Sequence, residues 1–293
     1  MSVLLDSLAA GFHGDAGQRT MLDAVLRDGL PAARNESWKY TSLRALERRV
    51  FAPPESDVVV DAAVLADIPT PRLVFVNGRF DAAHSAFAHL PDGMVLRPRS
   101  ATAEPSPDGA LPSATAASRD AVFARLAVAL AADGVMLQLA DGVRAPDPIH
   151  LVFLGMPARA DVASHARHVI TVGVDASATI VEHHRHGQGH ANLSNALTRI
   201  DLAPGAALLH ARIQDEATQA TLLARTDVTL EDNAHYERVD LELGAALSRH
   251  DLTIRLQGAR ARVSANGVLL ATGRRHIDTQ LGIEHVGRDT VCE

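Results

Sequence analysis

The chain has 293 residues, of which 47% are hydrophobic and 22% charged, and its formal net charge is -7. This length can bury a large core in one or two domains, and the negative balance argues against nucleic acid as a partner. The N-terminal segment has no basic region before its apolar residues, and no window approaches the ~20 apolar residues of a membrane span. The single cysteine, Cys292, excludes an internal disulfide. Together these features predict a cytoplasmic globular protein without a membrane or nucleic-acid partner.

The first part of the chain predicts a helix and an aromatic anchor. Apolar residues recur at helical spacing over residues 15–30, and Gly29 is typical of a helix end. A short segment then holds the only tryptophan and the only lysine, Trp38 and Lys39, followed by Tyr40. The tryptophan could stack on a cation. We favour an anchor that pins an N-terminal helix to the body of the protein.

The next segments define a predicted domain boundary. Residues 73–80 read as a strand, an Asn-Gly turn and a second strand, which predicts a hairpin. Residues 97–117 are rich in Pro, Ala, Ser and Thr and predict a linker. A helix is expected over 118–133. We therefore expect a small helical (α+β) N-terminal domain over residues 1–134 and a second domain over residues 135–293.

The second predicted domain contains a repeat. Segments that begin at Val172, Ile200 and Val228 share two alternating apolar residues, a turn, a small alanine and another strand, with a shift of 28 residues each time (200 − 172 and 228 − 200). A fourth copy at Ile254 fits if one residue is deleted from its turn. The corners are predicted at Ser177, Gly205, Asn233 and Gly258. A fixed shift favours stacked coils over a sandwich of hairpins, so the fold class is mainly β with a parallel β-helix core.

Histidines concentrate in this half of the chain, and four of them lie within residues 183–190. His184, His186 and His190 are candidate ligands for Zn, Ni or Fe, and the first two would share one face of a strand. No carboxylate or cysteine follows Glu182 within the cluster, so we expect an exposed, histidine-rich loop and no metal bound by this chain alone. Three further histidines near strand ends are expected to be structural, satisfied or half-exposed: His210, His235 and His250.

A late stretch, from Gly267 to His285, places several polar residues between strands and tight turns. His276 and Asp278 alternate, so both point to one side of a strand, and we expect them within hydrogen-bond reach of Glu284 or His285 on the next turn. A histidine oriented by an aspartate suits a general base or a metal ligand. It equally suits a buried polar rung that fixes a coil in register, which we favour.

Four motifs occur in an order that carries a family resemblance. They are Glu36-Ser-Trp-Lys-Tyr-Thr-Ser-Leu43, Leu73-Val-Phe-Val-Asn-Gly-Arg-Phe80, Asp147-Pro-Ile-His-Leu151, and the block from Gly267 through His276 and Asp278 to His285. From about Asn35 to its last residue, the chain resembles the SufB/SufD family of scaffold subunits in SUF iron–sulfur cluster assembly. The resemblance implies a right-handed parallel β-helix behind a mainly helical N-terminal domain.

The resemblance also implies a function without catalysis. The chain would take the place of SufD beside SufB and the ATPase SufC, with sulfur delivered by a cysteine desulfurase and its carrier and a transient Fe-S cluster formed in the complex. Family members continue through further coils, a Cys-Ser-His-Gly segment and a helical region that binds the ATPase. The chain would then be incomplete at its C-terminus and expose an apolar coil end. The motif residues expected in structural or interface roles are Trp38, Lys39, Tyr40, Gly267, His276, Asp278 and His285.

Enzymes provide the competing interpretations. A cupin-like metal enzyme could use the 183–190 histidine cluster, but the nearby Glu and more distant His expected of that class are missing. A β-helical polysaccharide lyase would need a targeting segment, and a hexapeptide-repeat acyltransferase would need a six-residue period. The scaffold interpretation needs the fewest additions.

Overall fold

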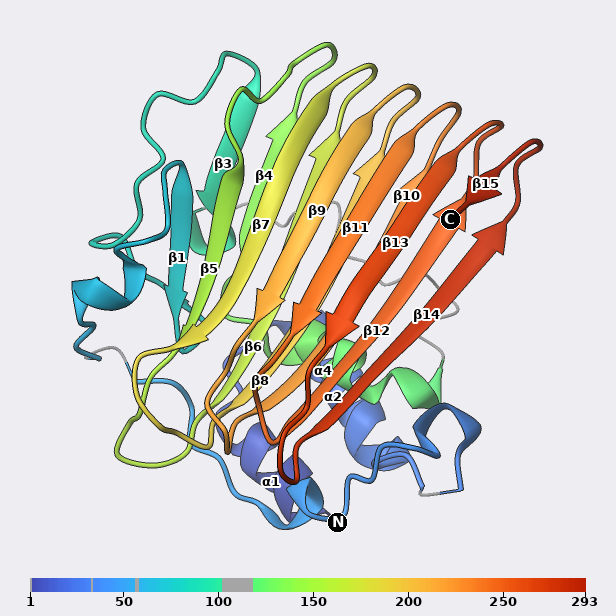
Figure 1. Cartoon of the computed structure of the whole chain (residues 1–293). Coiled ribbons are helices and arrows are strands. Elements are labelled where there is room, and N and C mark those ends of the chain that lie inside the picture. The colour runs from blue at the N-terminus through green and yellow to red at the C-terminus, as the bar shows by residue number, and fades with distance from the viewer. Residues whose placement is uncertain (1, 33, 56–57, 102–117) are drawn as a thin grey trace.

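Two long β-sheets face each other through a stack of coils (Figure 1). The computed structural model describes residues 2–32, 34–55, 58–101 and 118–293. One sheet has eight strands in the order β15-β13-β11-β9-β7-β5-β1-β2, and the other has seven in the order β14-β12-β10-β8-β6-β4-β3. From β4 and β5 onward, odd strands alternate with even ones along the chain and pair in parallel. The predicted parallel β-helix is therefore confirmed.

The elements have the following bounds. The helices are α1 (Val3–Ala10), α2 (Ala16–Asp28) and α4 (Val122–Leu130), with short 3-10 turns at η1 (Glu36–Trp38), η2 (Leu46–Arg48), η3 (Ala62–Leu65), η4 (Arg99–Ala101) and η6 (Arg119–Ala121). The strands are β1 (Arg72–Val76), β2 (Arg79–Phe80), β3 (Met94–Pro98), β4 (Val135–Leu139), β5 (Ile149–Gly155), β6 (Ala163–Val172), β7 (Ser177–His186), β8 (Leu193–Leu202), β9 (Ala207–Gln214), β10 (Thr221–Leu230), β11 (His235–Glu242), β12 (Leu247–Leu256), β13 (Arg262–Leu269), β14 (His276–His285) and β15 (Val291–Cys292).

The coils stack through rows of inward-facing aliphatic side chains. Ile200 pairs in register with Ile170 on one side and with Val228 on the other, and Val228 pairs with Ile254. The 28-residue shift is confirmed between the second and third copies, and Ile254 begins the fourth copy in register. The deletion expected in the turn of the fourth copy is wrong, because β11 starts at His235 after Leu230 whereas β13 starts at Arg262 after Leu256, which makes that turn one residue longer. The first copy is displaced, because Val172 pairs with a residue two positions beyond Ile200. A two-residue displacement keeps the same side chains inside, since strand side chains alternate with a period of two.

The corners of successive coils have positive φ angles, as the repeat predicts. Gly205 and Asn233 occupy two of them, with φ of 71° and 58°. The predictions for Ser177 and Gly258 are wrong, because Ser177 begins β7 and the positive φ angles fall elsewhere in those coils. Gly258 instead lies where an added Cβ would meet the backbone nitrogen of Asp232 at 2.0 Å. At the equivalent corners of the neighbouring coils, the positive φ angles fall at Asp175, Arg260 and Asp289.

Helices cover one side of the seven-stranded sheet. The α4 helix packs against β6, β8 and β10, and α2 packs on α4. Asp15 caps α2, accepting a hydrogen bond from the backbone nitrogen of Gln18 while the Gln18 side chain accepts one in return. The helix predicted over 118–133 begins at Ser118 as expected and ends at Leu130. No helix in the described ranges is both long and apolar enough to cross a membrane.

The predicted hairpin and linker take part in the sheets. The hairpin is confirmed as β1 and β2, and β1 also pairs in parallel with β5. Strand β3 pairs antiparallel with β4. Residues 97–101 of the predicted linker therefore lie in β3 and η4, whereas residues 102–117 lie outside the described residues.

The last described coil exposes apolar side chains, as expected of an uncovered coil. The inner face of β13 opens to solvent from Ala265 onward, and β14 is exposed or half-exposed along its length. The large apolar residues exposed here are Val268, Leu269, Leu270, Leu281, Val286 and Val291.

Candidate functional site

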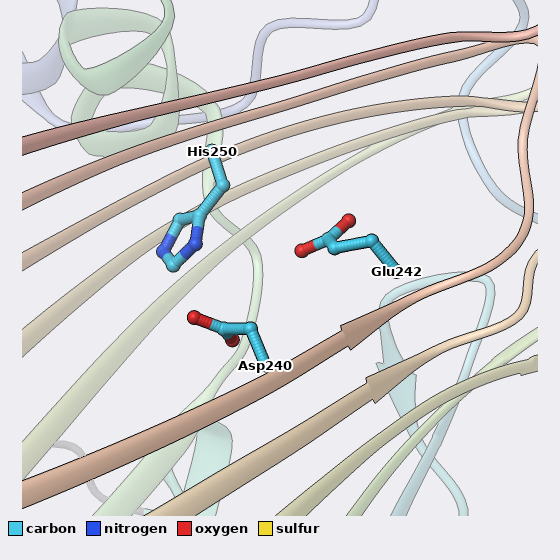
Figure 2. A group of neighbouring side chains, drawn as sticks. All are labelled: Asp240, Glu242 and His250. Carbon is cyan, nitrogen blue, oxygen red and sulfur yellow. The ribbon is translucent and has the colours of Figure 1, made fainter. Parts of the chain in front are cut away.

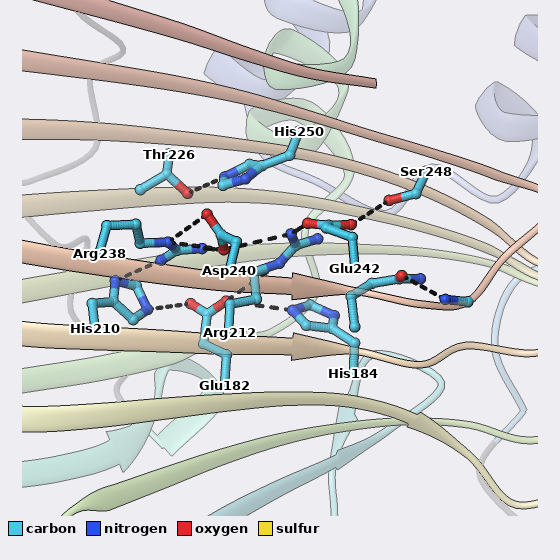
Figure 3. A network of polar contacts seen from close by, with 12 residues as sticks. Glu182, His184, His210, Arg212, Thr226, Arg238, Asp240, Glu242, Ser248 and His250 are labelled. Carbon is cyan, nitrogen blue, oxygen red and sulfur yellow. Dashed lines mark hydrogen bonds and ion pairs between the residues drawn. The ribbon is translucent and has the colours of Figure 1, made fainter. Parts of the chain in front are cut away.

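The interior of the β-helix changes from apolar to polar toward one end of its strands, and Figure 3 shows the polar part. Ile180, Leu208 and Tyr236 belong to the apolar core. Beyond them, every second residue continues to point inward, because side chains alternate along a strand. The polar residues at these positions are Glu182 and His184 of β7, His210, Arg212 and Gln214 of β9, and Arg238, Asp240 and Glu242 of β11; all are buried.

Two buried arginines neutralise carboxylates in this network. Arg238 donates to both oxygens of Asp240, with Nη2 to Oδ1 at 2.7 Å and Nε to Oδ2 at 3.1 Å. Arg212 pairs with Glu242 through Nη1. Each arginine side chain is 1% exposed. Charges this deep in a protein require such partners, because an unpaired buried charge is strongly unfavourable.

The histidines link these pairs to Glu182. Nδ1 of His210 accepts from Nη1 of Arg238 at 2.8 Å, because a guanidinium can only donate. His210 therefore carries its proton on Nε2, which donates to Oε1 of Glu182 at 3.0 Å. Nε2 of His184 lies 3.4 Å from the other oxygen of the same carboxylate. The network thus joins three neighbouring strands of one sheet.

Burial and paired charges set the protonation of the network. Burial raises the pKa of Glu216 to about 8, and burial together with the charges of Arg212 and Arg238 holds the pKa of His250 well below its usual value. Burial by itself raises the pKa of Asp240, but the charge and hydrogen bonds of Arg238 outweigh burial and lower this pKa to about 2. Near neutral pH the interior therefore holds ionised Asp240, protonated Glu216 and neutral His250.

Three side chains converge within the network (Figure 2). Asp240, Glu242 and His250 each offer a ligand atom, and these atoms lie within 4.8 Å of one another. The two carboxylates come from β11 and the imidazole from β12 in the facing sheet. Among the described residues, this is the one group of three or more histidines, cysteines or acidic residues with that spacing.

The histidine cluster of residues 183–190 differs from the exposed loop that the sequence predicted. His183 and His184 are buried within β7, so the expected exposed loop is wrong for these two residues. His184 joins the network, while His183 accepts or donates a hydrogen bond with His150 at 3.0 Å. His186 ends β7 and His190 follows in the next loop.

His184, His186 and His190 do not form a group with ligand atoms within 4.8 Å. The parallel pairing of the coils also differs from the antiparallel jelly roll of cupins. The three histidines expected to be structural are divided between environments, because His210 and His250 are fully buried in the network while His235 is exposed at the start of β11.

A second polar cluster joins the N-terminal motif to the last coils. Trp38 is buried, and the Arg249 guanidinium lies 4.0 Å from the centre of its ring. Arg249 also pairs with Asp278 at 2.8 Å. The Thr41 hydroxyl donates to Asp278 and lies 3.3 Å from Nε2 of His276. Trp38 is therefore the predicted anchor, and it also makes the cation stack that was the alternative.

The remaining motif residues lie outside both clusters. Lys39 and Tyr40 are exposed and contact each other, with the Lys39 nitrogen 5.4 Å from the Tyr40 ring centre. The expectation that His276 and Asp278 reach Glu284 or His285 is wrong, because all four lie on the single extended strand β14, which carries the latter two to its far end. His285 instead contacts Thr290 at 2.6 Å.

The residues that dominate the interior network are absent from the sequence-based predictions. They are Arg212, Arg238, Asp240 and Glu242, which continue the alternation of the apolar repeat with polar residues. That continuation is a detectable signal, because inward positions of a coil stay inward along the strand. What the sequence could not supply is the facing partner, since Ser248 and His250 approach from the other sheet.

Comparison with known proteins finds family matches along nearly the whole chain. Residues 16–151 match the family model described as the SufBD protein N-terminal region, and residues 155–293 match the SUF system FeS cluster assembly, SufBD core domain. The chain is 26% identical over 268 residues to the iron-sulfur cluster assembly protein SufD of Escherichia coli (strain K12), covering 90% of this chain and 61% of that protein. It is 25% identical over 264 residues to the iron-sulfur cluster assembly SufBD family protein slr0076 of Synechocystis, covering 85% and 58%. The chain thus spans about three fifths of the length of these curated relatives.

Proposed function

Because the chain belongs to the SufB/SufD family, with a role in iron–sulfur cluster assembly, we propose that it acts as a SufD-type scaffold subunit. The observation that carries this proposal is the pair of family matches, which follow one another along nearly the entire chain. In this proposal the subunit partners SufB and the ATPase SufC in the cytoplasm. A cysteine desulfurase and its carrier supply sulfur indirectly, and a transient Fe-S cluster forms in the complex.

A role without catalysis is part of the proposal. The acidic side chains of the interior network are at most 8% exposed, so no organic substrate could reach them without opening the coils. The exposed apolar side chains of the last described coil, including Leu270 and Leu281, support a role in which this end is covered by further protein.

Co-purification tests the proposal. We expect the protein to co-purify with co-expressed SufB and SufC homologues. Deletion of the gene should lower the activity of Fe-S enzymes in the cell, and complementation should restore it. A protein that binds neither partner and whose loss leaves Fe-S enzymes unchanged would contradict the proposal.

A further inference from the structure

We infer that Asp240, Glu242 and His250 form a binding site for one divalent first-row transition metal ion inside the β-helix. The sequence predicted no metal bound by this chain alone, and its candidate histidines lie elsewhere. The inference depends on side chains that only the fold brings together. It does not require the proposed scaffold function.

The ligand set suits such an ion. Asp240 and Glu242 are two residues apart on β11 and both point inward. His250 lies near the start of β12 in the facing sheet, so the three side chains approach from two directions (Figure 2). One imidazole nitrogen with two carboxylates is a mixed N/O donor set, which suits Zn²⁺, Fe²⁺ or Co²⁺ better than the all-oxygen shells of Mg²⁺ and Ca²⁺.

An unpaired nitrogen points to a ligand. Nε2 of His250 lies 3.0 Å from the Thr226 hydroxyl, whereas Nδ1 has no hydrogen-bond partner among the described residues, although the histidine is 1% exposed. Leaving a buried polar atom unpaired costs about 1–3 kcal/mol. Metal-binding histidines commonly use one ring nitrogen for a hydrogen bond that fixes the ring and the other for the metal, and the Thr226 hydroxyl supplies such a hydrogen bond here.

The carboxylates of the network outnumber its guanidiniums. The interior network holds three ion-paired carboxylates, those of Glu182, Asp240 and Glu242, against the two guanidiniums of Arg212 and Arg238. A bound cation would offset the one negative charge in excess, and it would be attracted by the carboxylates and repelled by the two guanidiniums.

The arginines leave lone pairs for an ion. Arg238 makes its closer contacts to Oδ1 of Asp240, at 2.7 and 3.0 Å, and reaches Oδ2 only through Nε at 3.1 Å. Arg212 contacts Oε1 of Glu242, and Oε2 accepts from the Ser248 hydroxyl at 3.1 Å. Each carboxylate oxygen can accept more than one such contact, so an ion can share these oxygens with the arginines.

A glycine opens one side of the site. On β13 the residue paired with Asp240 is Gly267, which has no side chain to cover the carboxylate. An added Cβ at Gly267 would contact Cβ of Asp240 at 3.5 Å. Asp240 accordingly keeps 7% exposure while Glu242 keeps 1%.

Cobalt titration of the protein tests the inference. We expect the wild type to bind one Co²⁺ with visible d–d absorption bands, and Zn²⁺ to displace it. Asp240→Asn, Glu242→Gln and His250→Gln should each weaken binding by about a hundredfold or more, since loss of even an indirect partner of a metal ligand costs about 10–100-fold. The matched control is Glu182→Gln, which removes the same charge from the same network without removing a proposed ligand, and its affinity should fall less than tenfold.

Two further controls decide what the signal means. Circular dichroism and thermal unfolding show whether each variant is folded, and X-ray absorption of the wild-type complex reports the ligands without any substitution. One imidazole with oxygen ligands supports the site. Absence of Co²⁺ binding by the wild type, equal losses in Glu182→Gln and Asp240→Asn, or loss in His190→Gln with retention in His250→Gln would each overturn it.

Discussion

The guanidinium of Arg249 lies 4.0 Å from the ring centre of Trp38, although the two residues are more than two hundred positions apart. Arg249 also donates to the backbone oxygen of Ser37 at 2.7 Å and pairs with Asp278 at 2.8 Å. The Thr41 hydroxyl reaches the same aspartate. The N-terminal motif and the late His276–Asp278 motif, found separately in the sequence, are thus two halves of one contact.

Substitution of Arg249 tests the strength of this contact. Arg249→Lys keeps the charge but cannot stack flat on Trp38 while also donating to Ser37 and Asp278. We expect the free energy of unfolding to fall by about 2 kcal/mol, the order of one or two charge-assisted hydrogen bonds. The control is Arg255→Lys, half-exposed on the same strand and 3.8 Å from Glu284, which should change stability by less than about 0.5 kcal/mol. Urea unfolding measures both, and equal effects would contradict the prediction.

Removal of the aromatic anchor should be more damaging. Trp38 is 4% exposed and its ring centre lies 5.6 Å from that of Phe123. We expect Trp38→Ala to cost about 3–5 kcal/mol, because it leaves a cavity under the N-terminal segment. Tyr40→Ala, at a side chain that is 73% exposed, should stay within about 0.5 kcal/mol. Thermal unfolding of the two variants compares them, and a Tyr40 effect as large as that of Trp38 would contradict this view.

Glu216 should make the protein less stable at higher pH. Its pKa is raised from 4.5 to about 8 by burial, so the folded state keeps a proton that the unfolded chain releases. Stability should therefore fall as pH rises from 4.5 to about 8, by at most about 1.4 kcal/mol per pH unit. In Glu216→Gln this contribution is absent, so the variant should gain stability over the wild type progressively toward pH 8. Unfolding curves at several pH values check this, and a constant difference between the two proteins would contradict it.

His165 should make the protein less stable at lower pH. Burial lowers its pKa from 6.5 to about 4, so the folded state holds it neutral where the unfolded chain is already protonated. Its contribution to stability is complete above pH 6.5 and is lost as pH falls toward 4. His165→Asn retains an acceptor for the hydrogen bond from Asn195. It should reduce the slope of the free energy of unfolding against pH, below pH 6.5, by the amount that corresponds to about one bound proton. An unchanged slope below pH 6.5 would rule out this role.

The corner of a coil supplies a fifth test. Asn233 has a φ of 58°, which a β-branched residue adopts only with strain. We expect Asn233→Val to cost about 1–2 kcal/mol and Asn233→Gly to remain within about 0.5 kcal/mol of the wild type. The order of the two unfolding midpoints is the decisive measurement.

Periodicity predicted the stack of coils because inward residues must alternate and each coil must cover the next. It placed Gly205 and Asn233 at corners correctly, since only a few residue types tolerate a positive φ. Periodicity placed the first copy two positions away from its true register. A displacement by an even number of residues keeps the same side chains on the inward face, so the alternating pattern cannot reveal it. The interior site was beyond this reasoning, since Asp240 and His250 meet only across the gap between the sheets.

The contact between Trp38 and Arg249 also limits when the N-terminal segment can complete its folding during translation. The ribosome makes the N-terminal segment first, yet its binding surface on β12 and β14 is completed only when the last described coil has been translated and stacked. Until then Trp38 lacks its contact with Arg249. This delay arises because the contacts of the fold join distant parts of the chain. The nascent protein therefore carries exposed apolar surface for most of its translation, the condition in which chaperones are most needed.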